Sequence, residues 1–145
     1  MGDYDINWIA LLVAAASSLV VGFVWYGPLF GKAWMKESGM TEEKVKSGNM
    51  ALIFGLSFVF ACFLSFTMWV QVMIGGGGGE IHGQEPFLTF KHGAFHGVLM
   101  GLFVILPVLG TIALYERKSI KYVLIAAGYW TVTLAVMGGI INAWI

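Results

Sequence analysis

Two histidines four positions apart are the residues whose type and spacing most directly suggest chemistry. His92 and His96 open a long apolar stretch, and residues four apart lie on the same face of an α-helix. Two imidazoles held side by side can bind a transition-metal ion such as Zn²⁺. His82, with Glu80 and Glu85 in the preceding segment, would complete a ligand set. The spacing therefore predicts a candidate metal site at His92, His96 and His82.

The histidine pair also has two other interpretations. No HExxH motif or thiolate cluster accompanies it, and Gly93 and Gly97 beside the histidines favour close packing against a neighbouring helix. His96 would then bond uncharged partners at a similar depth, such as Asn142 and Gln71. Protonation of the pair would alternatively gate a conformational change. The sequence leaves packing, metal binding and gating open.

A second candidate site combines aromatic and basic side chains. One group lies at the end of the first apolar stretch, and the other lies in the short connection after the third. Both groups would therefore meet at one membrane face. Glu116 with Lys32 or Arg117 would bind a small anion or a lipid headgroup there. The alternative is that these side chains only anchor the helix ends at the interface. The candidate residues are Trp25, Tyr26, Pro28, Gly31, Lys32, Trp34, Glu116 and Arg117.

The composition determines what kind of element must position these residues. Apolar residues make up 59% of the chain and charged residues 11%, with a mean hydropathy of +0.83. Soluble domains contain roughly 45–50% apolar and about 25% charged residues, so lipid must be the solvent for most of this chain. The zero net charge argues against a nucleic-acid partner. The single cysteine, Cys62, excludes an internal disulfide.

Four apolar stretches are long enough to cross a bilayer, which takes roughly 20 residues of helix. None of the four contains Lys, Arg, Asp or Glu. The predicted fold is an all-α integral membrane protein, a single four-helix transmembrane domain over residues 1–145. The expected spans are residues 8–26, 50–74, 93–115 and 122–145.

The basic residues predict the orientation of these spans. Seven of the eight lysines and arginines lie in the first and third connections, and only Lys91 lies on the other side. Because basic loops stay in the cytoplasm, we expect both of these connections inside and both chain termini outside.

Small residues recur at every fourth position in all four spans. Helices in lipid associate by close packing, which small residues permit. The four stripes are Ala10, Ala14, Ser18 and Gly22; Ser57, Ala61 and Ser65; Gly93, Gly97 and Gly101; and Ala127, Thr131, Ala135, Gly139 and Ala143.

The first and third stripes also predict an internal repeat. A shift of 79 residues superimposes them and lays Pro28 on Pro107 and Gly31 on Gly110. We expect two parallel hairpins related by a pseudo-two-fold axis along the membrane normal, although a chance match is the alternative. Pro107 should bend its helix. By analogy Pro28 would bend the first helix, which would run on towards Lys36; a break at the proline is the alternative.

Three segments carry a family resemblance: GFVWYGPLFGKAWMKESG at 22–39, LYERKSIKYVLIAAGYW at 114–130 and MGGIINAW at 137–144. They resemble a bacterial family of small membrane proteins named domain of unknown function 1761. The resemblance covers nearly the whole chain. It implies a four-helix multi-pass fold in the bacterial cytoplasmic (inner) membrane, and it implies no activity.

Residues that are absent narrow the function. No carboxylate or cation lies at the centre of a span, where proton-coupled transporters hold theirs. No nucleophile with a base partner and no nucleotide-binding loop is visible, so we expect neither an enzyme nor a cofactor. We expect a non-catalytic packing or accessory protein of the bilayer that forms a homo-oligomer or joins a larger membrane complex. The alternative is a small transporter or channel for a neutral solute or a metal ion.

Overall fold

The computed structural model describes residues 5–73 and 88–144, and every regular element in those two ranges is helical. The predicted all-α class is therefore confirmed. Of the residues proposed above, His82, Glu80 and Glu85 lie outside the described ranges. In chain order the elements are α1 (Trp8–Val24), η1 (Trp25–Leu29), α2 (Gly31–Ser38), α3 (Glu42–Lys46), α4 (Met50–Val72), α5 (Phe90–Met100), η3 (Gly101–Ile105), α6 (Leu106–Tyr115) and α7 (Ile120–Ala143), where η marks a π-helical turn.

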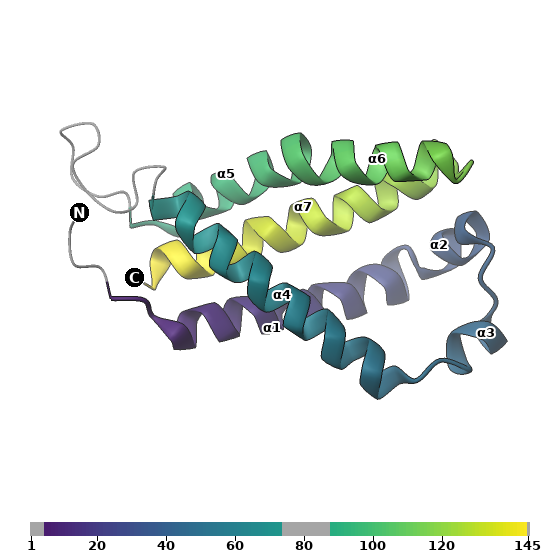
Figure 1. The fold of residues 1–145 in the computed structure, drawn as a ribbon, viewed down its shortest axis with the longest axis horizontal. Helices are drawn as coiled ribbons and strands as arrows, with labels where there is room; N and C mark the ends of the chain where they lie inside the picture. Colours follow the sequence, from purple (N-terminus) through teal and green to yellow (C-terminus); the bar gives the residue numbers. More distant parts are fainter. Residues whose placement is uncertain (1–4, 74–87, 145) are drawn as a thin grey trace.

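Four helical rods in the described residues are long and apolar enough to cross a membrane, which confirms the predicted spans. They cover Trp8–Leu29, Met50–Val72, Phe90–Tyr115 and Ile120–Ala143. The start of α1 and the end of α7 lie at one end of the bundle, and the opposite end carries α2, α3 and the α6–α7 turn (Figure 1). We call the latter the basic end, because seven of the eight lysines and arginines lie there, and the former the terminal end. That the basic end faces the cytoplasm stays a prediction.

Polar caps explain where the spans begin. The side chains of Asn7, Asn49, Thr89 and Ser119 each accept a hydrogen bond from the backbone N–H three residues later, at 3.0–3.3 Å. Such caps satisfy N–H groups that the helix itself leaves unpaired. The third span consequently starts at Phe90 and the fourth at Ile120, a few residues before the starts expected from hydropathy.

The closest helix contact joins α5 to α7. A Cβ at Gly93 would overlap the backbone carbonyl of Gly138, and one at Gly97 would overlap that of Leu134. The two backbones therefore touch where any side chain would hold them apart. The small-residue stripe of the third span therefore packs against α7 of the same chain.

The buried core lies towards the terminal end, where α1, α4 and α7 meet. Its fully buried residues are Ala14, Ala15, Ala61, Met68, Val72, Leu134 and Met137. The Ser65 hydroxyl, also buried, donates to the carbonyl of Leu11 at 2.7 Å and joins α4 to α1. In this half of the molecule α4 belongs to the bundle.

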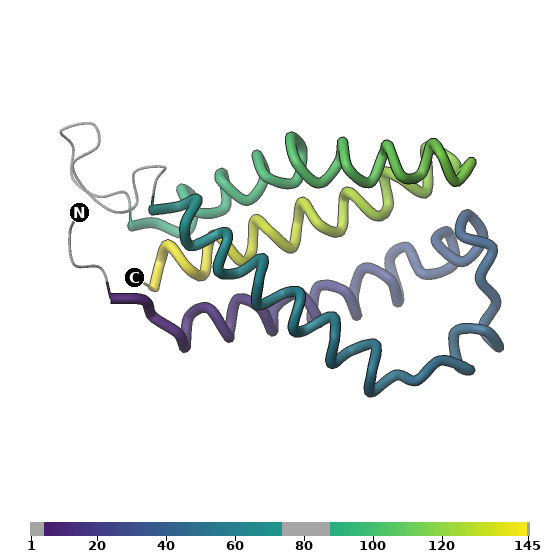
Figure 2. The backbone as a smooth tube through the Cα atoms, in the orientation of Figure 1, coloured from purple at the N-terminus to yellow at the C-terminus, as the bar shows by residue number. Residues whose placement is uncertain are grey.

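Towards the basic end α4 leaves the bundle. Every residue of Met50–Ser57 is exposed, and the backbone trace shows α4 running diagonally away from the other rods (Figure 2). This divergence opens a gap that the side chains described below only partly fill.

The two prolines in the described residues lie within or next to π-helical turns. Pro28 lies within η1, and Pro107 follows η3 directly, as expected where a missing backbone N–H disturbs the α-helical ladder. The first helix passes through Pro28 and is interrupted only at Phe30 (φ −125°), after which α2 begins. This outcome lies between the two predicted alternatives. A shift of 79 residues would place η1 on 104–108, which overlaps η3 at two positions only, so the repeat stays a prediction.

Candidate functional site

The histidine pair lies in the first turns of α5, at the terminal end. The Nε2 atoms of His92 and His96 are 3.1 Å apart, and the ring centroids are 4.7 Å apart at an interplanar angle of 63°. Both side chains are half-buried. The predicted juxtaposition on one helix face is present.

This geometry suits two chemical states. At 3.1 Å one Nε2–H can donate to the other Nε2, provided that the two rings carry different tautomers. Two nitrogen ligands at about 2.0–2.1 Å from a tetrahedral Zn²⁺ would lie about 3.3 Å apart, close to the same separation. The separation of the two nitrogens is thus compatible with a shared proton and with two ligands of one metal ion.

The remaining ligands of the predicted metal site are not brought to the pair by the described residues. Within 5–73 and 88–144 no group of three His, Cys, Asp or Glu side chains is placed to hold a metal ion. His82, the third predicted ligand, lies outside these ranges. The metal site stays a prediction that rests on His92 and His96.

Asn142 and Gln71, the uncharged partners expected near His96, differ in burial. Asn142 is fully buried, and its Nδ2 donates to the backbone carbonyl of Thr89 at 2.6 Å, which joins α7 to the start of α5. Gln71 is exposed on α4. The terminal end of α5 is thus fixed by Asn142.

Trp25 of the aromatic–basic candidate site fastens α1 to α7. Its indole Nε1 donates to the carbonyl of Ile125 at 3.0 Å. Its ring lies over Gly128, where a Cβ would be only 2.9 Å from the Trp25 ring. A glycine opposite a tryptophan makes room for this bond between helices.

Tyr26 and Trp34 form a second contact between the signature segment and α7. The Tyr26 ring lies 5.5 Å from that of Trp34 and 5.2 Å from that of Tyr129, centroid to centroid. Gly31 is buried at the turn into α2, where a Cβ would overlap the Tyr26 carbonyl. With Pro28 inside η1, these residues of the predicted site pack the signature segment against α7 and α2.

The charged members of the predicted site do not join this cluster. Lys32, Glu116 and Arg117 are exposed, and no ion pair between them is present in the described part of the chain. Arg117 has a positive φ of 58°, and this left-handed turn directs the chain from α6 into α7. The anion or headgroup site at Lys32, Glu116 and Arg117 therefore stays a prediction.

Other residues make the polar link at the basic end. The Ser119 hydroxyl donates to the Glu37 carboxylate at 2.5 Å, and Lys118 Nζ donates to the Ser38 carbonyl at 3.3 Å. Sequence reasoning missed this link between α2 and the α6–α7 turn. Ser119 carried a signal, since it is the polar residue directly before the fourth span.

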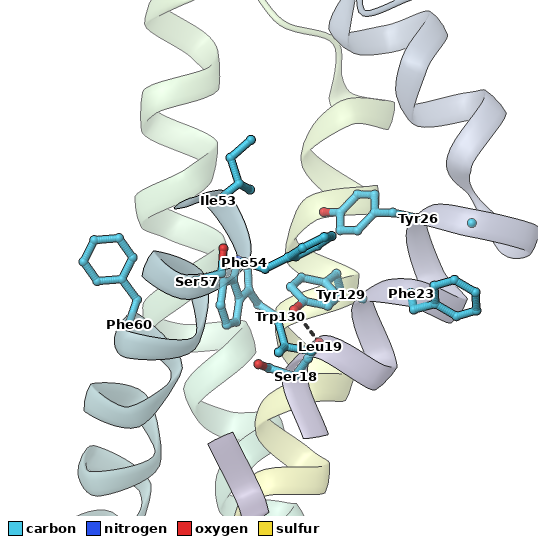
Figure 3. A pocket seen from close by; sticks show the side chains of 12 residues that line it. Ser18, Leu19, Phe23, Tyr26, Ile53, Phe54, Ser57, Phe60, Tyr129 and Trp130 are labelled. Carbon is cyan, nitrogen blue, oxygen red and sulfur yellow. Dashed lines mark hydrogen bonds between the residues drawn. The ribbon is translucent and has the colours of Figure 1, made fainter. Parts of the chain in front are cut away.

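A crevice of about 740 Å³ is a feature that the sequence did not reveal. It lies between α1, α4 and α7 where α4 diverges (Figure 3). No charged side chain lines it. Its lining residues are Ser18, Leu19, Gly22, Phe23, Tyr26, Gly27, Ile53, Phe54, Ser57, Phe60, Tyr129 and Trp130.

The wall of the crevice is held by one hydrogen bond between helices. The Tyr129 hydroxyl donates to the backbone carbonyl of Ser18 at 2.9 Å, and Figure 3 shows this bond at the base of the aromatic group. The Ser18 hydroxyl donates to Ala15 within its own helix. The α1–α7 wall is therefore fixed, and α4 forms the loosely attached side.

Comparison with known proteins connects this fold to a family. The family described as protein of unknown function (DUF1761) matches residues 9–142, which include all four spans almost completely. No curated protein and no solved structure matches the chain. The predicted resemblance is thereby confirmed, and the chain belongs to the DUF1761 family.

Proposed function

We propose that this protein is a non-catalytic membrane protein that acts by assembling with other transmembrane helices, in the first place with a second copy of itself. The observation that carries the proposal is Gly55, in the exposed part of α4. Within the α-helical parts of the four described spans, Gly55 alone has no atom within 4 Å of the position that a Cβ would occupy.

Gly55 differs in this respect from the other span glycines. Gly22, Gly128 and Gly139 each face an aromatic ring, and Gly93 and Gly97 face backbone. Those glycines are explained by contacts inside the chain. A mid-helix glycine costs about 1 kcal/mol relative to alanine, and no contact with the described residues 5–73 and 88–144 accounts for that cost at Gly55.

The surroundings of Gly55 suit a partner helix. Ala51 lies one turn earlier on the same face, which gives a small–xxx–small pair. Both residues belong to the segment Met50–Ser57, exposed throughout. A helix of a second copy could approach this face of α4 closely.

The proposal includes the expected location, the bacterial cytoplasmic membrane with the basic end inside. Seven of eight basic residues at one end support this orientation. The α4 face would then lie in the inner half of the bilayer.

Native mass spectrometry in mild detergent tests the proposal. Wild-type protein should give a homo-oligomer, and Gly55→Leu should give monomer. Gly110→Leu is the matched control, because Gly110 is another span glycine with only Val123 at 4.0 Å from a Cβ position, and it should remain oligomeric. A monomeric wild type, or dissociation by Gly110→Leu and not by Gly55→Leu, contradicts the proposal.

The histidine pair favours a second candidate function, handling of a metal ion at the terminal end. The 3.1 Å separation of the two Nε2 atoms supports it. Metal analysis of protein purified after exposure to Zn²⁺ tests it, with His92→Ala and His96→Ala as variants. Bound zinc in the wild type that both variants lose supports the metal function, and equal metal content in all three proteins removes it.

A further inference from the structure

The crevice between α1, α4 and α7 has the depth of one half of the bilayer. Its lining on α1 and η1 runs from Ser18, near the middle of the first span, to Gly27 at the basic end. Nine residues of helix cover about 13 Å at 1.5 Å per residue, and half of the hydrocarbon layer is about 15 Å. An occupant would therefore enter from the lipid and lie within one leaflet.

The lining restricts the chemistry of that occupant. It contains no charge, so a charged headgroup has no partner inside. The rings of Tyr26, Phe54, Tyr129 and Trp130 gather at the centre of the crevice, as Figure 3 shows. Aromatic faces pack best against another flat ring. The volume of about 740 Å³ lies within the usual range of small-molecule sites, about 300–1,000 Å³.

Three polar groups in the lining also need a partner. In the part of the chain that the structure describes, no hydrogen bond joins Trp130 Nε1, the Ser57 hydroxyl or the Tyr26 hydroxyl to another residue. An unpaired polar group within lipid is costly. The indole N–H can only donate, so the occupant should carry an acceptor oxygen beside its ring.

We propose that the crevice binds a lipid of the isoprenoid-quinone class, which is neutral and combines a flat ring, carbonyl oxygens and an apolar tail. The ring lies among Tyr26, Phe54 and Trp130, a carbonyl accepts from Trp130 Nε1, and the tail leaves between α1 and α4 into the bilayer. The acyl chain of a phospholipid would fill the volume but leave Trp130 Nε1 unpaired. The proposal concerns binding alone.

This site is independent of the proposed assembly surface. Ile53 and Ser57 line the crevice, and Gly55 is two positions from each of them. A helix turns about 100° per residue, so Gly55 lies on the opposite face of α4. A failure of one proposal therefore leaves the other standing.

Equilibrium binding to purified protein in nanodiscs tests the inference, with decylubiquinone as the probe and decanol as the ringless control ligand. We expect saturable binding of decylubiquinone only. Trp130→Phe, which keeps a ring and removes the N–H, should weaken binding about tenfold, the usual effect of one lost hydrogen bond. Trp69→Phe is the matched control, since Trp69 lies on α4 outside the lining, and it should bind as wild type.

A second variant keeps the test decisive if Trp130→Phe fails to fold. Ser57 is exposed on α4, so Ser57→Phe should leave the fold intact, fill the crevice and abolish binding. Equal affinity for decylubiquinone and decanol, or equal binding by Trp130→Phe and Trp69→Phe, overturns the proposal. So does recovery of phospholipid alone, without quinone, from the wild-type protein extracted directly from membranes.

Discussion

At the scale of single residues, the signature segment contributes packing between helices. Trp25 reaches from η1 to the carbonyl of Ile125 in α7, and Gly128 makes room for its ring. Tyr26 contacts Trp34 and Tyr129. These contacts lie at the basic end, where α4 has diverged. The aromatic residues there pack beside buried aliphatic residues of α7 such as Ile125 and Ala127.

Trp25→Phe tests this role. The substitution keeps an aromatic ring but removes the indole donor, so the free energy of unfolding should fall by about 1–2 kcal/mol. Trp8→Phe is the control, because Trp8 is 62% exposed, and it should change stability little. Thermal unfolding in detergent gives the comparison. Equal midpoints for the two variants would show that the Trp25–Ile125 bond contributes nothing.

Some contacts between single residues could be predicted from the sequence and others could not. The i, i+4 spacing correctly placed His92 beside His96, because helix periodicity alone determines it. The expected site formed by Glu116 with Lys32 or Arg117 stays a prediction, because all three side chains are exposed in the structure. Which residues meet across the basic end depends on the left-handed turn at Arg117, and no sequence period reports such a turn.

At the scale of elements, the spans were predictable and their mutual angles were not. Hydropathy located all four rods, and polar caps account for the small shifts at their starts. The divergence of α4 left no trace in the sequence. Its residues are apolar on every side because lipid and protein are equally apolar neighbours, so the pattern does not say which half of α4 is packed.

Two glycine substitutions separate internal from external packing at this scale. Gly97→Ala should lower the free energy of unfolding by about 1–3 kcal/mol, because the new methyl group overlaps the Leu134 carbonyl. Gly55→Ala has open space and should raise stability by up to about 1 kcal/mol through helix propensity. Unfolding titrations of the monomeric protein measure both. The same sign for both changes would contradict the described packing of α5 on α7.

In the molecule as a whole, the basic residues are concentrated at one of the two ends of the helical bundle. The terminal end carries Lys91 and the histidine pair, and the basic end carries the other seven cations. Two connections far apart in sequence meet at the basic end through Glu37 and Ser119. The positive charge at the basic end predicts that this end faces the cytoplasm.

Single cysteines at opposite ends report that orientation. In a Cys62→Ala background, Leu88→Cys should react with a membrane-impermeant maleimide in intact cells, because it lies at the terminal end. Ser47→Cys, at the basic end, should react only after permeabilisation. Neither change alters a charged residue. The reverse pattern of labelling would invert the topology, and labelling of both sites in intact cells would remove it.

Cysteine cross-linking in native membranes is the most direct test of assembly through the exposed face of α4. In the Cys62→Ala background, Gly55→Cys should form a disulfide-linked dimer on mild oxidation, because the two α4 helices would meet there. Gly110→Cys, on α6, should stay monomeric under the same conditions. A dimer at Gly110→Cys with none at Gly55→Cys, or no dimer at either position, would contradict the account.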